Sequence, residues 1–257
     1  MRNILRRQYA SEEVFEIGEN INGDIERFRT ASTKERYQTK LLIGHMTHGL
    51  HRFFPGHATC LTMLRDPVNR VYSEYRFLSS NRYHPLYSVV APLSYHHYLE
   101  VDPTRQAGNG QTRLLSGSTY GNKTGVPGIE PIVKAHLDRA LDHLQRNYPL
   151  VGLLEKFDET LMLWQTQFNW RYPLYEKQNI STRLSRPLDD SEIEHTRAKN
   201  EFDLIIYLEA AKLLDANLKK QPGSFHRRLK TFKLLNTTYQ KSKHRGRILK
   251  RKLLREA

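Results

Sequence analysis

The sequence contains a single cysteine, Cys60, among 257 residues. One cysteine excludes an internal disulfide and a zinc site built on cysteines. Cys60 lies in the apolar run Ala-Thr-Cys-Leu-Thr-Met. That setting favours a buried, small hydrophobic side chain over a nucleophile.

Long apolar runs are also absent. No run approaches the roughly 20 residues that span a bilayer, and no signal peptide opens the chain. The apolar content of 38% fits a soluble protein. We therefore expect no membrane span and a cytoplasmic location.

Acidic residues are scarce in only one part of the chain. Residues 219–257 hold 14 Lys and Arg against the single acidic Glu256, a net charge of +13. The preceding 218 residues hold 27 Lys and Arg against 26 Asp and Glu, a net charge of +1. The sequence thus predicts a nearly neutral domain over 1–218 and a basic tail over 219–257. We expect the tail to be a solvated helix or a disordered end. Nucleic acid is not the expected partner, although binding of nucleic acid or an acidic surface through the tail stays an alternative.

Short apolar runs alternate with segments of helical spacing along the first 218 residues. The expected strands are 13–17, 40–46, 58–64 and 150–155, and the longer expected helices are 67–80, 131–148, 157–169 and 189–220. This alternation predicts an α/β fold of three layers, with a parallel sheet flanked by helices. In such sheets ligands bind beyond the carboxyl ends of the strands. His45, Arg65 and Glu155 each end a strand, so we expect them at one rim.

The stretch Leu-Arg-Asp-Pro at 64–67 joins an expected strand to an expected helix. Asp66 can cap the helix, and Pro67 suits its first position because it has no N–H to satisfy. Arg65 beside the positive end of the helix dipole predicts an anion site. Ser73, two turns further on, would add a hydroxyl to a large anion. The alternative is that Arg65 pairs with a carboxylate and Ser73 only fills space.

Five sequence blocks, in order, resemble one enzyme family. They are IGHMTHGL (43–50), LRDPVNRVYSEYRFL (64–78), NGQTRLLSG (109–117), VGLLEKFDETL (151–161), and NISTRLSR (179–186) with NEFDLIIYLEA (200–210). Together they are similar to sulfotransferases, most closely to the heparan sulfate 2-O- and 6-O-sulfotransferases and their bacterial relatives. The resemblance covers about residues 1–218. It implies a P-loop-type fold and transfer of a sulfuryl group from 3′-phosphoadenosine 5′-phosphosulfate (PAPS) to a hydroxyl, by default that of a carbohydrate.

The resemblance also implies roles for individual residues. His45 matches the catalytic base of the family, and histidine suits proton removal near neutral pH. Arg65 and Ser73 match the pair that holds the 3′-phosphate of PAPS. Thr182 and Arg183 match the loop that closes over the nucleotide.

The chain departs from the family at its start. The family opens with a strand and a phosphate loop of the type Pro-Lys-Thr-Gly-Thr-Thr, and we expect these to be missing through truncation, which would leave these 257 residues inactive alone. A Lys-Thr-Gly in GNKTGVPG (121–128) is interpreted as a surface loop, because no strand precedes it.

Phe77 stands where the 6-O-sulfotransferases have a histidine, so heparan specificity is not expected. A non-catalytic relative that binds a nucleotide or glycan is the alternative. Eukaryotic relatives are Golgi membrane proteins, which makes the Golgi the alternative location.

Three histidines, His45, His48 and His51, follow one another at a spacing of three. Such spacing also suggests a metal site. No carboxylate or thiolate accompanies the three in sequence. We therefore expect no metal ion, and PAPS as the only co-substrate.

Overall fold

Four short apolar runs form strands, and both of their pairings are parallel. The computed structural model describes the chain except for residues 19, 119–130, 178–185 and 257. Strand β1 (Val14–Ile17) pairs with β2 (Leu41–Gly44), and β3 (Met63–Leu64) pairs with β4 (Gly152–Leu153). Parallel strands need a crossover connection. Helices α2 (Ile21–Thr30) and α3 (Thr33–Gln38) supply it between β1 and β2.

Helices make up most of the described structure, which is therefore a mixed α/β fold with few strand residues. Besides α2 and α3, the α-helices are α1 (Arg2–Arg6), α4 (Pro67–Ser80), α5 (Tyr87–Val90), α6 (Tyr95–Val101), α7 (Gly110–Leu115), α8 (Lys134–Asn147), α9 (Phe157–Phe168), α10 (Asp190–Lys199), α11 (Glu201–Lys219) and α12 (Gly223–Glu256). Short 3₁₀ turns are η1 (Ser11–Glu13), η2 (Leu50–Phe53) and η3 (Leu154–Lys156).

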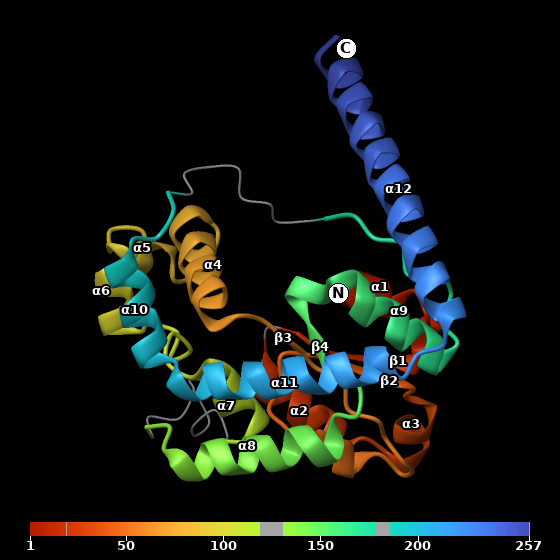
Figure 1. Cartoon of the computed structure of the whole chain (residues 1–257), viewed down its shortest axis with the longest axis horizontal. Helices are drawn as coiled ribbons and strands as arrows, with labels where there is room; N and C mark the ends of the chain where they lie inside the picture. Colours follow the sequence, from red (N-terminus) through yellow and green to blue (C-terminus); the bar gives the residue numbers. More distant parts are fainter. Residues whose placement is uncertain (19, 119–130, 178–185, 257) are drawn as a thin grey trace.

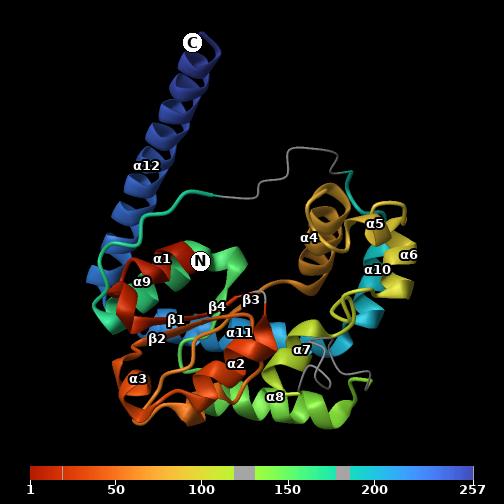
Figure 2. The same ribbon diagram turned by 180° about the vertical axis from the view of Figure 1, so that it is seen from behind.

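Helices lie on both sides of the strands. Figures 1 and 2 show α1 and α9 on one side and α2, α3 and α8 on the other. The main hydrophobic core joins both strand pairs to α1, α8, α9, α11 and α12, and its largest fully buried side chains include Trp164, Leu153 and Leu144. A second, smaller core lies where α4, α5 and α6 meet, around Val71 and Tyr98. The polar residues described below lie between the two cores.

The predicted single sheet is only partly present. The parallel direction of the strands is confirmed, but the described residues form two separate two-stranded sheets. The predicted strand 58–64 is reduced to Met63–Leu64, and the predicted strand 150–155 to Gly152–Leu153. A strand persists only where a neighbouring strand takes up its backbone N–H and C=O groups. β3 meets β4 over two residues, and β4 then leads through η3 into α9.

The predicted long helix 189–220 is divided in two. Helix α10 ends at Lys199 and α11 begins at Glu201, because Asn200 leaves the helical conformation (φ −126°, ψ 33°). The Asn200 side chain is fully buried and binds backbone groups outside these helices. The helix is therefore interrupted at the residue whose side chain forms hydrogen bonds with the segment 107–109. The predicted end at 221–223 is confirmed, since α11 stops at Lys219.

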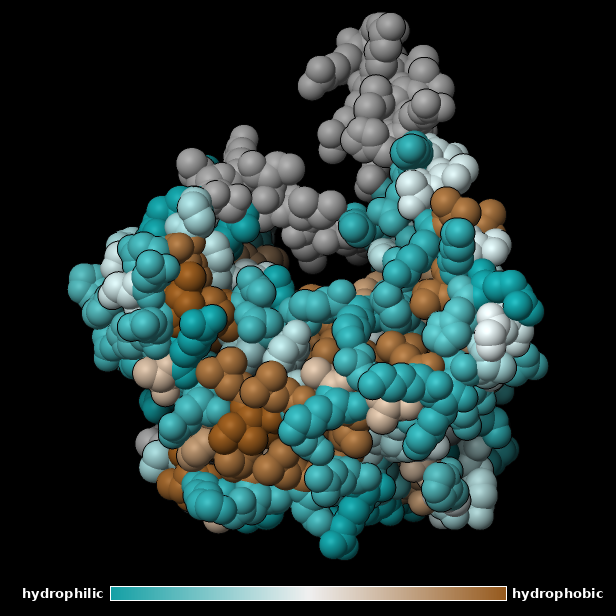
Figure 3. Space-filling model, viewed as in Figure 1, coloured by the Kyte–Doolittle hydropathy of each residue, from teal (hydrophilic) through white to brown (hydrophobic). Residues whose placement is uncertain are grey.

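Helix α11 is apolar on two faces. Ile206, Ala210 and Leu214 point inward at a spacing of four and are fully buried. On the outer face Ile205 and Leu208 are 44% and 58% exposed. Figure 3 shows apolar side chains gathered over the first half of α11 and toward α8.

The basic tail begins as part of the main core and then extends away from it. Phe225, Phe232 and Asn236 of α12 are buried, and α12 packs against α9. Asn236 accepts a hydrogen bond from the backbone N–H of Tyr175 at 2.9 Å. Beyond this contact α12 projects from the body (Figure 1). Among the described helices, α12 included, none has a stretch both long and apolar enough to cross a membrane.

Replacing Phe232 tests whether α12 stabilises the body. Phe232→Ala removes a fully buried ring, and such a change costs about 3–5 kcal/mol of unfolding free energy. Leu234→Ala is the matched control, because Leu234 is 65% exposed on the same helix and surface substitutions stay within about 0.5 kcal/mol. Urea denaturation followed by circular dichroism measures both. Equal effects of the two substitutions would contradict the packing of α12 on the core.

Candidate functional site

The junction between β3 and α4 is formed as its sequence predicts. Asp66 caps α4, since its side chain accepts a hydrogen bond from the backbone N–H of Asn69 at 2.9 Å. Pro67 occupies the first turn of the helix. The cap satisfies one free N–H, and proline removes another. Arg65 is consequently placed between the end of a strand and the positive end of a helix.

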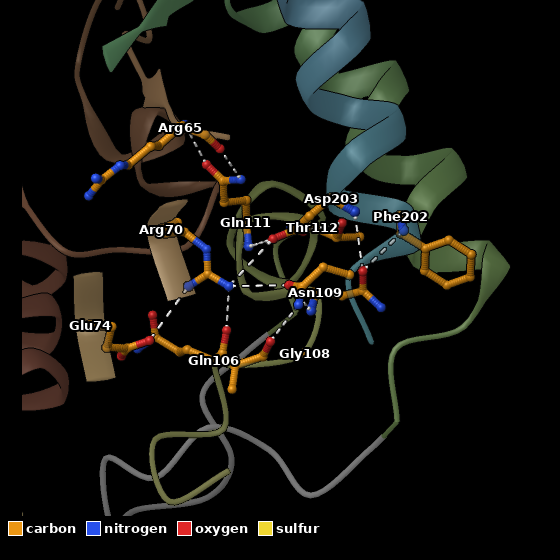
Figure 4. A network of polar contacts seen from close by, with 12 residues as sticks. Arg65, Arg70, Glu74, Gln106, Gly108, Asn109, Gln111, Thr112, Phe202 and Asp203 are labelled. Carbon is orange, nitrogen blue, oxygen red and sulfur yellow. Dashed lines mark hydrogen bonds and ion pairs between the residues drawn. The ribbon is translucent and has the colours of Figure 1, made fainter. Parts of the chain in front are cut away.

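The backbone of Arg65 is held by the side chain of Gln111 in α7. The backbone N–H of Arg65 donates to Gln111 Oε1, and Gln111 Nε2 donates to the carbonyl of Arg65, both at 2.9 Å. The side-chain amide of Gln111 thus forms the same two hydrogen bonds with the Arg65 backbone that a peptide group of a neighbouring strand would form. Figure 4 shows the guanidinium of Arg65 turned away from Gln111. The backbone is therefore fixed while the charged group stays available.

The guanidinium of Arg65 is half-buried and forms no ion pair with any described residue. Burial lowers its pKa, and the nearby charges of Glu155 and Asp66 offset this only in part. Both carboxylates already accept hydrogen bonds from backbone N–H groups. Glu155 Oε1 accepts from the N–H of Asp66 at 3.1 Å, and the Asp66 carboxylate accepts from the N–H of Asn69. A cation that is partly removed from water and has no direct partner loses hydration that no opposite charge replaces. Of the three residues expected at one rim, Arg65 and Glu155 lie close together but form no ion pair. The meeting of His45 with these two residues stays a prediction.

Behind the junction, the fully buried carboxylate of Asp203 joins three helices (Figure 4). It accepts the backbone N–H groups of Gln111 at 3.0 Å and Thr112 at 2.7 Å, and the Thr112 hydroxyl at 2.7 Å. Arg70 of α4 lies 3.7 Å from it and equally far from Glu74. Asp203 thus connects the first turns of α7 and α11 to α4, and it positions the glutamine that holds Arg65.

Two asparagines complete this network. Asn109 has a left-handed backbone (φ +52°) that turns the chain into α7. Its side-chain oxygen accepts the N–H groups of Phe202 and Asp203 at 3.1 and 3.2 Å. Asn200 accepts the N–H of Asn109 at 3.0 Å and donates to the carbonyl of Ala107 at 2.7 Å. Asn109 therefore accepts free N–H groups at the start of α11, and Asn200 accepts the N–H of the residue that precedes α7.

His45 follows β2 directly, as predicted, and keeps an exposed surface. The protein around the imidazole is nevertheless dense enough that desolvation lowers its pKa, and the positive charge of Arg2 lowers it further. A lowered pKa keeps the imidazole neutral at physiological pH. A neutral imidazole is the form that can accept a proton.

The other predicted residues have different outcomes. Ser73 lies half-buried on α4, about 9 Å along the helix axis from Pro67 at the usual rise per residue. Its sharing of one phosphate with Arg65 stays a prediction. Thr182 and Arg183, together with the Lys-Thr-Gly at 123–125, lie outside the described residues.

Although no thiol accompanies the three histidines in sequence, the fold places one beside two of them. Cys60 lies beside His48 and His51, with the candidate ligand atoms of all three within 4.8 Å of one another. His45 is not part of this group. Burial and the neighbouring His143 and His51 lower the pKa of His48 to about 4. Burial raises the pKa of the Cys60 thiol.

Sequence reasoning assigned no role to the residues that organise the junction. Gln111, Asp203 and Asn200 are polar side chains buried in the fold. Gln111 lies in the block at 109–117 and Asp203 in the block at 200–210. Both blocks resemble the sulfotransferase family, but the resemblance assigned no role to either residue. The usable signal was Asp203, an acidic residue directly before the apolar run 204–208. No comparable pattern in the sequence indicates that Cys60 lies beside His48 and His51, which precede it by 12 and 9 residues.

Replacing Asp203 tests the network. Asp203→Ala leaves Arg70 without one of its two carboxylates and two buried N–H groups without an acceptor. Removing one partner of a buried charged pair costs about 3–5 kcal/mol of unfolding free energy. Asp215→Ala is the control, because it removes a solvent-exposed pair with Lys156, worth about 0–1 kcal/mol. Thermal and urea denaturation measure both, and similar losses would show that Asp203 is not structurally central.

We compared the chain with protein-family models and with curated proteins. No family model matches the chain, and none of the curated proteins matches it. The features of the chain that bear on its function are therefore the β3–α4 junction, His45 and the sequence blocks that surround them.

Proposed function

We propose that this protein is a PAPS-dependent sulfotransferase that transfers a sulfuryl group to a hydroxyl, by default that of a carbohydrate. The observation that carries the proposal is the half-buried guanidinium of Arg65, which has no ion-pair partner among the described residues. It follows a parallel strand and precedes a helix N-terminus. A phosphate bound there would supply the missing counter-charge.

The arrangement of strands and helices supports the same proposal. Both strand pairs are parallel, and helices lie on both sides of them. A P-loop-type core requires this arrangement. Ligands of parallel sheets bind beyond the carboxyl ends of the strands, and both His45 and Arg65 follow such ends.

Sulfuryl transfer requires a base that removes the proton of the acceptor hydroxyl and fixed positive charges that hold the nucleotide. The acceptor oxygen forms a bond to sulfur while the bond between sulfur and the bridging phosphate oxygen breaks, releasing 3′-phosphoadenosine 5′-phosphate. His45 would take the proton of the acceptor hydroxyl, and its lowered pKa keeps it ready to do so. Arg65 and Ser73 would hold the 3′-phosphate, which fixes the nucleotide relative to the base.

Nucleotide binding tests the role of Arg65. Arg65→Ala should weaken binding of 3′-phosphoadenosine 5′-phosphate about 10- to 100-fold, because a charge-assisted hydrogen bond is lost. Binding of AMP, which has no 3′-phosphate, should change little. Isothermal titration calorimetry measures both nucleotides, with Arg76→Ala, on the same helix, as the charge-matched control. Equal losses for the two nucleotides would remove Arg65 from the 3′-phosphate site.

Turnover tests the role of His45. In a chain extended by the family's first strand and phosphate loop, His45→Ala should lower the rate of sulfation about 10²- to 10⁴-fold, the usual contribution of general acid–base catalysis, with nucleotide affinity nearly unchanged. In that extended chain with His45 intact, the rate should fall as pH drops and the imidazole gains a proton, with a midpoint below 6.5. The assay follows labelled sulfate from PAPS into a carbohydrate acceptor, with His57→Ala as control.

The same assays separate the alternatives. Nucleotide binding that depends on Arg65, without turnover even in the extended chain, identifies a non-catalytic relative. Unchanged turnover in His45→Ala contradicts its role as the base. If the extended chain shows no nucleotide binding and no turnover, that result contradicts the proposed function as a whole.

A further inference from the structure

A group of histidine and cysteine side chains lies in the connection from β2 to β3, away from the β3–α4 junction. His48 follows β2, His51 belongs to η2, and Cys60 comes shortly before β3. Their ligand atoms lie within 4.8 Å of one another. We propose that His48, His51 and Cys60 bind one zinc ion.

The spacing of these atoms fits a tetrahedral ion after a small adjustment. With Zn–N near 2.0–2.1 Å and Zn–S near 2.3 Å, two ligand atoms on tetrahedral zinc lie about 3.3–3.7 Å apart. Atoms already within 4.8 Å therefore need to close by at most about 1.5 Å, which side-chain rotation can supply. The backbone of the connection need not refold.

The hydrogen bonds around the histidines leave ligand atoms free. His48 Nδ1 lies 3.2 Å from the hydroxyl of Tyr148, so its Nε2 is the nitrogen available to an ion. A partner on the second ring nitrogen is what orients ligating histidines in metal sites. His51 Nδ1 is buried and has no hydrogen-bond partner among the described residues. A buried polar atom without a partner is rare and costly, and an ion would satisfy it.

The surroundings keep the cluster compact. The ring of His143, from α8, stacks on His48 with centroids 3.9 Å apart. His143 Nδ1 lies 2.8 Å from the carbonyl of Leu115; this oxygen only accepts, so the nitrogen is the donor. The backbone N–H of His48 donates to the carbonyl of Leu114 at 2.9 Å. Helices α7 and α8 thus hold His48 in place from two sides.

The ligand types select the ion. Two imidazoles and a thiolate form a borderline-soft set that suits zinc, whereas magnesium and calcium require oxygen ligands. Three protein ligands leave the fourth tetrahedral position to water or to an external donor. The ion would join η2 and Cys60, which are otherwise connected by irregular chain, to the part of the fold anchored by α7 and α8. This inference is independent of the proposed sulfotransferase activity.

Cobalt(II), a spectroscopic substitute for zinc, tests the site in the full chain without a histidine tag. The reduced protein, freed of metal with a chelator, should bind one equivalent of Co²⁺. Its spectrum should show a thiolate-to-cobalt charge-transfer band and the strong d–d bands of tetrahedral coordination. Zinc should then displace the cobalt and remove both. Absence of the thiolate band, or the weak d–d bands of octahedral cobalt, would overturn the proposal.

Single substitutions assign the ligands. Cys60→Ser should abolish the charge-transfer band, and His48→Ala and His51→Ala should each lower zinc affinity at least about 100-fold, more than loss of an outer partner does. Tyr148→Phe should lower it about 10-fold, as expected for the hydrogen bond that orients His48. His57→Ala, an exposed histidine in the same connection, is the control and should bind zinc normally.

Thermal unfolding distinguishes a lost ligand from a lost fold. Zinc should raise the melting temperature of the wild-type protein and of His57→Ala, because an ion that binds only the folded state stabilises it. Zinc should not raise that of Cys60→Ser, a nearly isosteric change. An equal zinc-dependent rise in Cys60→Ser and the wild-type protein would overturn the proposal.

Discussion

The buried carboxylate of Asp203 is the interaction on which the centre of this fold depends. A charged group removed from water is tolerated only when hydrogen bonds and an opposite charge replace its hydration. Asp203 obtains them from two backbone N–H groups and a hydroxyl of α7 and from Arg70 of α4. These partners belong to segments more than 90 residues away in sequence from Asp203, or more than 130 for Arg70. The position of Gln111, and hence of the Arg65 backbone, follows from this one requirement.

Local features of the sequence predicted the local structure well. The Asp66 cap, Pro67 in the first turn and the end of α11 before Pro222 depend on neighbouring residues only, and all three are present. The single sheet and the unbroken helix 189–220 depended on distant contacts. The break at Asn200 arises because its buried amide binds Ala107 and Asn109, which periodicity cannot reveal. The placement of Cys60 beside His48 likewise depends on how an irregular connection folds back.

The two candidate sites differ in what they need from the fold. At the β3–α4 junction the protein supplies a fixed backbone and an unpaired cation, so an anion of suitable size would complete the charge balance. In the β2–β3 connection it supplies two nitrogen atoms and a sulfur atom, so a cation would complete the coordination. Both follow parallel strands whose backbone hydrogen bonding covers few residues. Ligands would thus add order where regular secondary structure contributes least.

The projection of α12 gives the molecule a strong electrical asymmetry. At 1.5 Å per residue its 34 residues extend for about 51 Å, and the segment 219–257 carries +13 while the rest carries +1. Charge separated over such a length makes the protein a large electric dipole. In the field of any negatively charged macromolecule the dipole experiences a torque before contact. At low ionic strength the protein would therefore approach such a macromolecule with the end of α12 leading, and added salt would randomise that orientation.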